Sequence, residues 1–95
     1  MTTKPRAHLV TLDPQSIAGR MFLEGNNDGT TTVGQLKCPV LHCKSIAMDN
    51  PIGLSVVRTP LSGTPKEQSL IIPFSAVALI FDWYGEENAF GFASR

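Results

Sequence analysis

The chain has 95 residues, and its eight basic side chains balance its eight acidic ones to give a formal net charge of zero. This balance argues against broad electrostatic binding to duplex nucleic acid, which needs a clearly basic face. With 42% hydrophobic and 17% charged residues, the composition excludes a disordered chain and predicts one globular domain over residues 1–95.

The start of the chain and the cysteines predict a soluble, cytoplasmic protein. No long apolar stretch follows the first basic residues, so we expect no signal peptide. The longest apolar run has about 13 residues and contains Pro73, which is too short to span a bilayer. Cys38 and Cys43 are expected to be reduced thiols, because a small secreted domain more often carries a fuller disulfide set.

The first part of the chain predicts a loose arm at residues 1–6 and then one short element. Ala7–Leu12 is either a short strand or the approach to a helix. Asp13 can accept hydrogen bonds from the first turn of a helix, and the proline that follows suits the first helical position. We therefore expect a short helix over residues 14–18, ended by Gly19.

A hairpin is predicted next. Residues 21–24 are expected to be extended, and the sequence NNDG at 26–29 favours a tight turn, because Asn and Gly accept positive φ. Residues 30–38 have the β-branched content of a partner strand, which Pro39 interrupts. Further strands are predicted at 41–48, 52–58, 69–72 and 77–81, with a polar hairpin tip at 60–66.

The run from residue 69 to residue 83, SLIIPFSAVALIFDW, is the most informative segment. Pro73 cannot donate to a sheet ladder, so the run predicts two strands joined by a tight turn at 73–76. In the second strand Val77, Leu79 and Phe81 would point one way and Ala78 and Ile80 the other, which makes both faces apolar. Such a strand needs cover on both sides, from a closed barrel, a neighbouring subunit, or both. The fold class that we expect is all-β, a five-stranded SH3-like barrel with a short N-terminal helix.

The order of elements also resembles a known family. A short helix, a bent strand, a Gly-x-Leu strand (here Gly34-Gln35-Leu36) and two final strands around a tight turn are similar to the Sm-like barrel of LSm and Hfq proteins, over about residues 14–82. The resemblance implies a homo-oligomeric ring in which the two final strands pair with neighbouring subunits. The interface residues that it implies are Ile71, Ile72, Val77, Leu79 and Ile80.

The Sm-like family binds single-stranded RNA through two loops, so the resemblance implies an RNA site as well. The candidate residues in or near these loops are Lys37, His42, Lys44, Asp49, Asn50 and Phe74. Phe74 stands in the second loop, where it would either stack on a base or pack in the core.

A second resemblance implies a different ligand. The segment IIPFSAVALIFDWYGEENAFGF is similar to the end of the barrel in SspB, an adaptor that holds degradation-tagged peptides for a protease and shares the Sm-like topology. It implies a peptide-binding module. A purely structural assembly component is the third alternative. The aromatic residues of the tail at 84–95, with Trp83, would either cap the barrel or contact a partner.

We expect no enzyme, no metal site and no cofactor. Cys38, His42 and Cys43 are ligand types that zinc accepts, but adjacent residues of a strand face opposite sides. No nucleophile motif occurs, and the neighbouring Glu86 and Glu87 are more typical of a solvated patch than of an acid/base pair.

Overall fold

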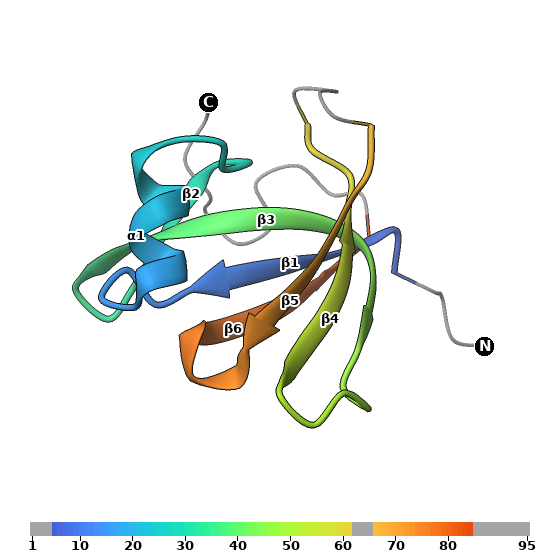
Figure 1. The fold of residues 1–95 in the computed structure, drawn as a ribbon. Helices are drawn as coiled ribbons and strands as arrows, with labels where there is room; N and C mark the ends of the chain where they lie inside the picture. The colour runs from blue at the N-terminus through green and yellow to red at the C-terminus, as the bar shows by residue number, and fades with distance from the viewer. Residues whose placement is uncertain (1–4, 62–65, 85–95) are drawn as a thin grey trace.

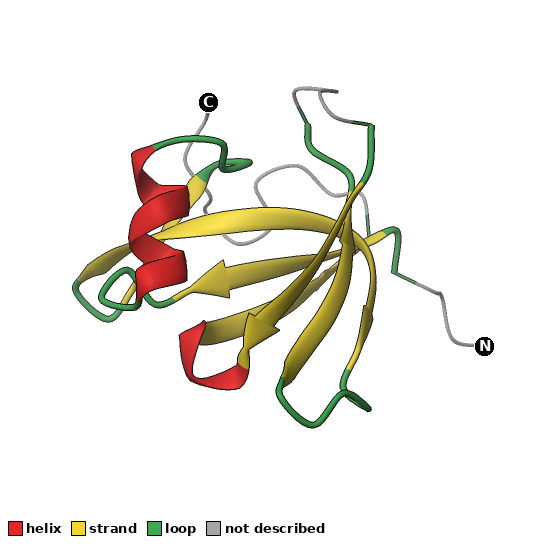
Figure 2. Cartoon of the chain, in the orientation of Figure 1, coloured by secondary structure: helices red, strands yellow, loops and turns green. Residues whose placement is uncertain are grey.

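The computed structural model describes residues 5–61 and 66–84, which form one antiparallel sheet and one α-helix (Figures 1 and 2). In chain order the elements are β1 (Ala7–Leu12), α1 (Ile17–Glu24), β2 (Thr30–Val33), β3 (Leu36–Ala47), β4 (Gly53–Arg58), β5 (Gln68–Pro73), a 3₁₀ turn (Phe74–Ala76) and β6 (Val77–Trp83). Outside the described residues lie most of the predicted N-terminal arm, part of the predicted hairpin tip and most of the aromatic tail, at residues 1–4, 62–65 and 85–95. The last of these ranges includes Glu86, Glu87, Phe90 and Phe92.

The mostly β class is confirmed, but the sheet has six strands and is open. Its strand order is β5-β4-β3-β1-β6, and β2 pairs with β3 beside this path. The two strands predicted to end the fold are both formed, yet β5 pairs with β4 and β6 pairs with β1. The predicted five-stranded closed barrel is therefore replaced by a curled sheet whose last two strands stand at its two ends (Figure 1).

The segment Ala7–Leu12, for which a strand and the approach to a helix were both open, is strand β1, an inner strand of the sheet between β3 and β6. Val10 pairs with Leu41 of β3 on one side and with Ile80 of β6 on the other. Nearly every residue of β1 is buried on both faces. The helix therefore follows the first strand instead of beginning the fold, as the short N-terminal helix was expected to do.

The predicted helix boundaries are wrong at both ends. Ser16 caps the N-terminus, since its Oγ accepts a 2.9 Å hydrogen bond from the Gly19 amide, and the helix runs through the segment 21–24 that was expected to be extended. Gly19 lies in the first turn because a side chain has no room there: a Cβ would meet the Asp13 carbonyl oxygen at 1.7 Å. The glycine permits close packing and does not end the helix.

The predicted hairpin is shifted along the chain. The turn between β2 and β3 lies at Gly34, which has a φ of +65°, whereas residues 26–29 connect α1 to β2. Pro39 lies inside β3 opposite Thr30, and the next residue, Val40, pairs with Thr11 of β1. The proline is tolerated because β3 changes its partner at this point, where a missing N–H costs little.

The core lies on the inner face of the curled sheet, under α1. It contains Val10, Leu12, Phe22, Leu41, Cys43, Leu54, Val56, Ile72 and Ala76. In β6 the expected alternation is interrupted, because Leu79 pairs with Thr11 and Val77 pairs with Leu12, which leaves Ala78 as an extra residue. Val77 and Ile80 therefore both pack against the core, and Leu79 is 43% exposed.

Candidate functional site

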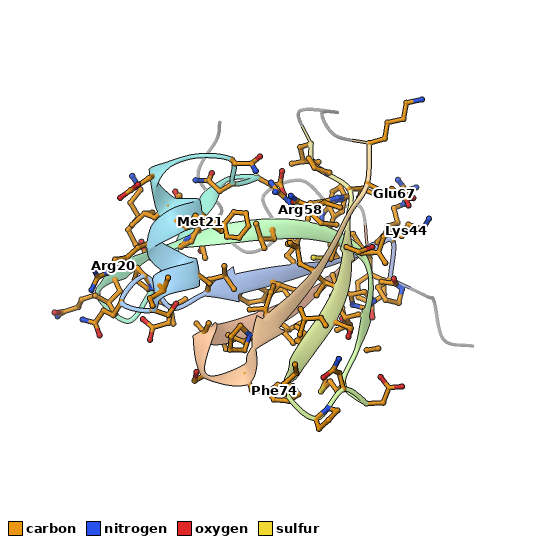
Figure 3. All side chains as sticks on the ribbon, viewed as in Figure 1. Arg20, Met21, Lys44, Arg58, Glu67 and Phe74 are labelled. Atoms are coloured by element: carbon orange, nitrogen blue, oxygen red, sulfur yellow. The ribbon has the colours of Figure 1, made fainter. Side chains whose placement is uncertain are left out.

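The six residues proposed for an RNA site are not gathered in one place. Lys37 and Lys44 lie at two ends of β3, seven residue steps apart, which is on the order of 20 Å along a strand. Lys44 Nζ lies 2.7 Å from Glu67 Oε2, so its charge is paired at the surface (Figure 3). Figure 3 places Phe74 at the opposite end of the sheet from this pair.

His42 has structural partners. Its backbone N–H donates to Asp28 Oδ2 at 2.8 Å, and its ring Nδ1 lies 2.9 Å from the hydroxyl oxygen of Thr59. The ring also meets Trp83 edge to face, with 5.7 Å between the ring centroids. A half-buried imidazole held in this way packs β3 against the ends of β4 and β6.

The other three candidates lie at one end of the sheet. Asp49 and Asn50 belong to the turn between β3 and β4, where the Asn50 side chain accepts a 2.9 Å hydrogen bond from the Ile52 amide. Phe74 follows Pro73, which pairs with Gly53 directly after that turn. Phe74 is 46% exposed, so it is not fully packed in the core, which was one of the two alternatives expected for it.

Of the five residues proposed for an oligomer interface, three serve the chain's own core. Ile72 is buried, and Val77 and Ile80 pack against the core cluster. Ile71 on β5 and Leu79 on β6 remain, and they are 52% and 43% exposed. These two leave large apolar surface for another molecule.

The thiols lie in unreactive surroundings. Cys38 and Cys43 are both buried and free, and burial raises the pKa of each. For Cys43 burial, together with the nearby Asp28 carboxylate, raises the pKa to about 12, so the thiolate that a nucleophile or metal ligand requires is disfavoured. Residues 5–61 and 66–84 contain no group of three or more His, Cys, Asp or Glu side chains that could hold a metal ion.

A buried ion pair that sequence reasoning missed lies between α1 and the sheet. Arg58 Nε and Asp28 Oδ2 are 3.0 Å apart, and both side chains are 1% exposed. The guanidinium also donates to Gln68 Oε1 at 3.0 Å and to the Asn26 carbonyl, and it lies over the ring of Phe22. Every nitrogen of Arg58 thus has a partner.

The Asp28 carboxylate is equally well satisfied. Besides Arg58 it accepts from the His42 amide at 2.8 Å and from the Leu61 amide at 2.9 Å. The pair therefore joins the α1–β2 loop to β3, β4, β5 and the start of the β4–β5 connection. A carboxylate whose acceptor sites are filled by the protein is a structural group, and no spacing in the sequence could connect it to an arginine 30 residues away.

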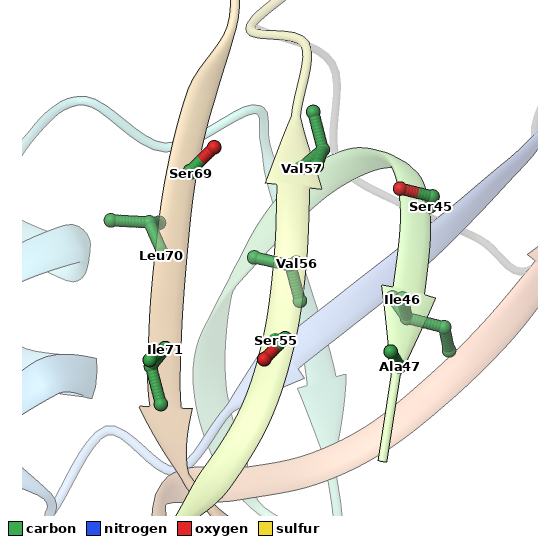
Figure 4. A pocket seen from close by; sticks show the side chains of 9 residues that line it. All are labelled: Ser45, Ile46, Ala47, Ser55, Val56, Val57, Ser69, Leu70 and Ile71. Atoms are coloured by element: carbon green, nitrogen blue, oxygen red, sulfur yellow. The ribbon is translucent and has the colours of Figure 1, made fainter. Parts of the chain in front are cut away.

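A groove of about 530 Å³ lies over β3, β4 and β5 (Figure 4). Three consecutive positions on each strand line it: Ser45, Ile46, Ala47, Ser55, Val56, Val57, Ser69, Leu70 and Ile71. The volume is within the range of about 300–1,000 Å³ typical of ligand pockets. No lining residue is charged, and only Ile71 is among the residues that the sequence singled out.

Comparison of the chain with protein-family models, with curated proteins and with solved structures finds no match. Among the described residues, no helix has the length and apolar character needed to cross a membrane. We therefore infer the function from the positions of the described residues alone.

Proposed function

We propose that the chain is a non-enzymatic binding module that holds a peptide segment in the groove over β3, β4 and β5. The observation that carries this proposal is the composition of the groove, which is lined by hydroxyl and aliphatic side chains and by no charge. Such a surface suits a neutral polypeptide, whose backbone and small side chains need hydrogen bonds and apolar contact. The peptide-binding module that the sequence of residues 71–92 led us to expect has the same ligand class.

Single-stranded RNA is the less favoured ligand. Phosphate binding needs basic side chains along one track, but Lys37 and Lys44 are separated and Lys44 is paired with Glu67. An RNA complex would therefore rely on Phe74 with few charges beside it.

Assembly into a homo-oligomer, including an Sm-like ring, is a second candidate that one observation favours. Strands β5 and β6 stand at opposite ends of the sheet, and each carries one exposed large aliphatic residue, Ile71 or Leu79. An end strand with an apolar side chain is a template for pairing with another copy. Such pairing would leave the groove face open but would occupy the edge of β5.

The test is a selection of random nonapeptides displayed on phage against the immobilised full chain and, in parallel, against Ser55→Asp. Ser55 lies in the centre of the groove and is half-buried. A carboxylate there keeps enough water for the fold to survive, but a neutral peptide that covers it would remove this water without supplying a counter-charge. We expect peptides that bind the natural chain at least tenfold tighter than Ser55→Asp. Thr32→Asp places the same charge on an exposed position of β2 and is the matched control.

Ligand class is then separated by salt. Binding of a selected peptide should change less than threefold between 50 and 200 mM salt, whereas an RNA complex with several phosphate contacts would weaken by orders of magnitude. If oligo-U or oligo-A binds tightly at low salt and no peptide is enriched, the peptide proposal is wrong and the RNA alternative takes its place.

A further inference from the structure

The outward face of β3, β4 and β5 has a regular composition. One row across the strands is Ser45, Val57 and Ser69, and the next is Ala47, Ser55 and Ile71. Because side chains alternate between the faces of a strand, these six share one face, whereas the other three lining residues, Ile46, Val56 and Leu70, have side chains that pack in or against the core. The face therefore carries three hydroxyls and three aliphatic groups, and no side chain on it is larger than isoleucine.

The nearest charges along these strands neutralise one another. Lys44 directly precedes Ser45, Glu67 lies two residues before Ser69, and their side chains form the 2.7 Å ion pair described above. A ligand charge placed on this face would lose water beside Ile71 and Ala47 without gaining a counter-ion. The face thus selects against charged side chains.

The edge of β5 provides a backbone template next to this face. Within the described part of the chain β5 pairs only with β4, so alternate N–H and C=O groups of Gln68–Pro73 point away from the sheet. Natural edge strands are usually protected by lysine or by inward-pointing charges, but Gln68–Pro73 contains no charged residue. Only Pro73, which lacks an N–H, limits the ladder at its end.

Building on the proposed function, we infer that the peptide backbone pairs with the edge of β5 as an additional strand, while every second side chain leans over Ser69 and Ile71 into the groove, toward Ser55. Strands in a sheet lie about 4.8 Å apart, so these alternate side chains extend the two rows by one position. They must be small or aliphatic and uncharged. The intervening side chains point to the other face, beside Leu70 and Ile72, so a change on the groove face does not alter their surroundings.

This mode predicts a period of two in the selected peptides. Lys and Arg should be at least tenfold rarer at alternate positions in the nonapeptides selected on the natural chain than in those selected on Ser55→Asp, and equally frequent in the two pools at the positions between them. A helical ligand would show a period of 3.6 instead. The best peptide is then made with a single N-methyl group at each position in turn. Methylation at alternate residues should weaken its affinity at least tenfold, because every second N–H faces β5.

Ile71→Asp and Thr32→Asp complete the experiment, with thermal melts to show that each variant is folded. Loss of binding in Ile71→Asp together with retention in Thr32→Asp supports the mode. Strand addition would be wrong if the enriched peptides depend on Ser55 but show no period of two in their charged residues or in their sensitivity to N-methylation. That result would still support peptide binding in the groove. Enrichment that is equal on the natural chain and on Ser55→Asp would overturn the proposed function itself.

Discussion

At the scale of single residues, the Arg58 and Asp28 pair is the interaction with the largest expected energetic effect. Removing one partner of a buried ion pair leaves an uncompensated charge, which typically costs about 3 to 5 kcal/mol. Arg58→Ala should therefore lower the free energy of unfolding by about this amount, as measured by urea denaturation. The Asp28 carboxylate would keep its two amide donors but lose its counter-charge.

Lys44→Ala is the matched control, since it removes a cation from an ion pair whose side chains are about half exposed. Surface pairs contribute about 0.2 to 1 kcal/mol, so the free energy of unfolding of this variant should be close to that of the natural chain. Equal effects of the two variants would contradict the structural role assigned to the buried pair.

The Cys43 thiol gives the stability of the fold a dependence on alkaline pH. Burial raises its pKa to about 12 from the ordinary thiol value of 9.0. Between these values the unfolded chain releases the thiol proton and the folded chain keeps it. Stability should consequently fall as pH rises above 9, by up to about 1.4 kcal/mol per pH unit. Urea denaturation at pH 8, 9 and 10 measures this slope, and it should be shallower in Cys43→Ala, which has no thiol to ionise. Parallel slopes in the two proteins would exclude Cys43 as the source.

At the scale of the elements, the docking of α1 depends on the absence of a side chain at residue 19. Alanine usually stabilises a helix relative to glycine by about 0.5 to 1 kcal/mol. Here the added Cβ would overlap the Asp13 carbonyl oxygen, so Gly19→Ala should instead destabilise the fold by about 1 to 3 kcal/mol. The opposite sign in a thermal or urea melt would show that the helix can move away at no cost.

Gly25→Ala provides the comparison at the other end of the same helix. A Cβ at Gly25 meets no atom within 4 Å, and the residue has an extended φ of 176°. This variant should lie within about 0.5 kcal/mol of the natural chain, as surface substitutions usually do.

The elements that could be predicted from the sequence are those with strong local signals. The two strands on either side of the turn at 73–76 were found because Pro73 and the aliphatic runs leave few alternatives, and β4 was found within one residue. The errors arose where tertiary context decides. Gly19 serves packing instead of ending a helix, and Pro39 is accommodated where β3 changes partner.

The site was less predictable than the fold for a similar reason. A groove formed by Ser, Ala and Val side chains carries no motif, and its residues come from three separate segments of the chain. The residues that the sequence did single out are chemically distinctive, but His42 is used by the fold and Lys44 by an ion pair. In this chain the residues with distinctive side-chain chemistry did not indicate where the groove lies.

At the scale of the whole molecule, the two ends of the sheet raise the question of self-association. If β5 of one copy pairs with β6 of the next, light scattering at micromolar concentration should give a molar mass that is a multiple of 10.3 kDa. Leu79→Glu should then return a monomer, because a carboxylate at the contact would be desolvated, and Thr32→Glu should not. A monodisperse monomer in the natural chain would exclude the ring and leave the β5 edge free for a peptide.

The pairing of β1 with β6 has a consequence for how the chain folds. Its register joins His8 to Asp82, so residues that face each other on adjacent strands are separated by 74 residues of sequence. Such nonlocal pairing makes folding slow relative to that of proteins with local contacts. During synthesis on the ribosome, β1 is made first and its partner β6 is made last. Until residues 77–83 have left the exit tunnel, β1 therefore has an unpaired apolar edge. For that interval the nascent chain exposes an apolar strand edge of the kind that favours aggregation, and slower translation of the final strand would lengthen this exposure.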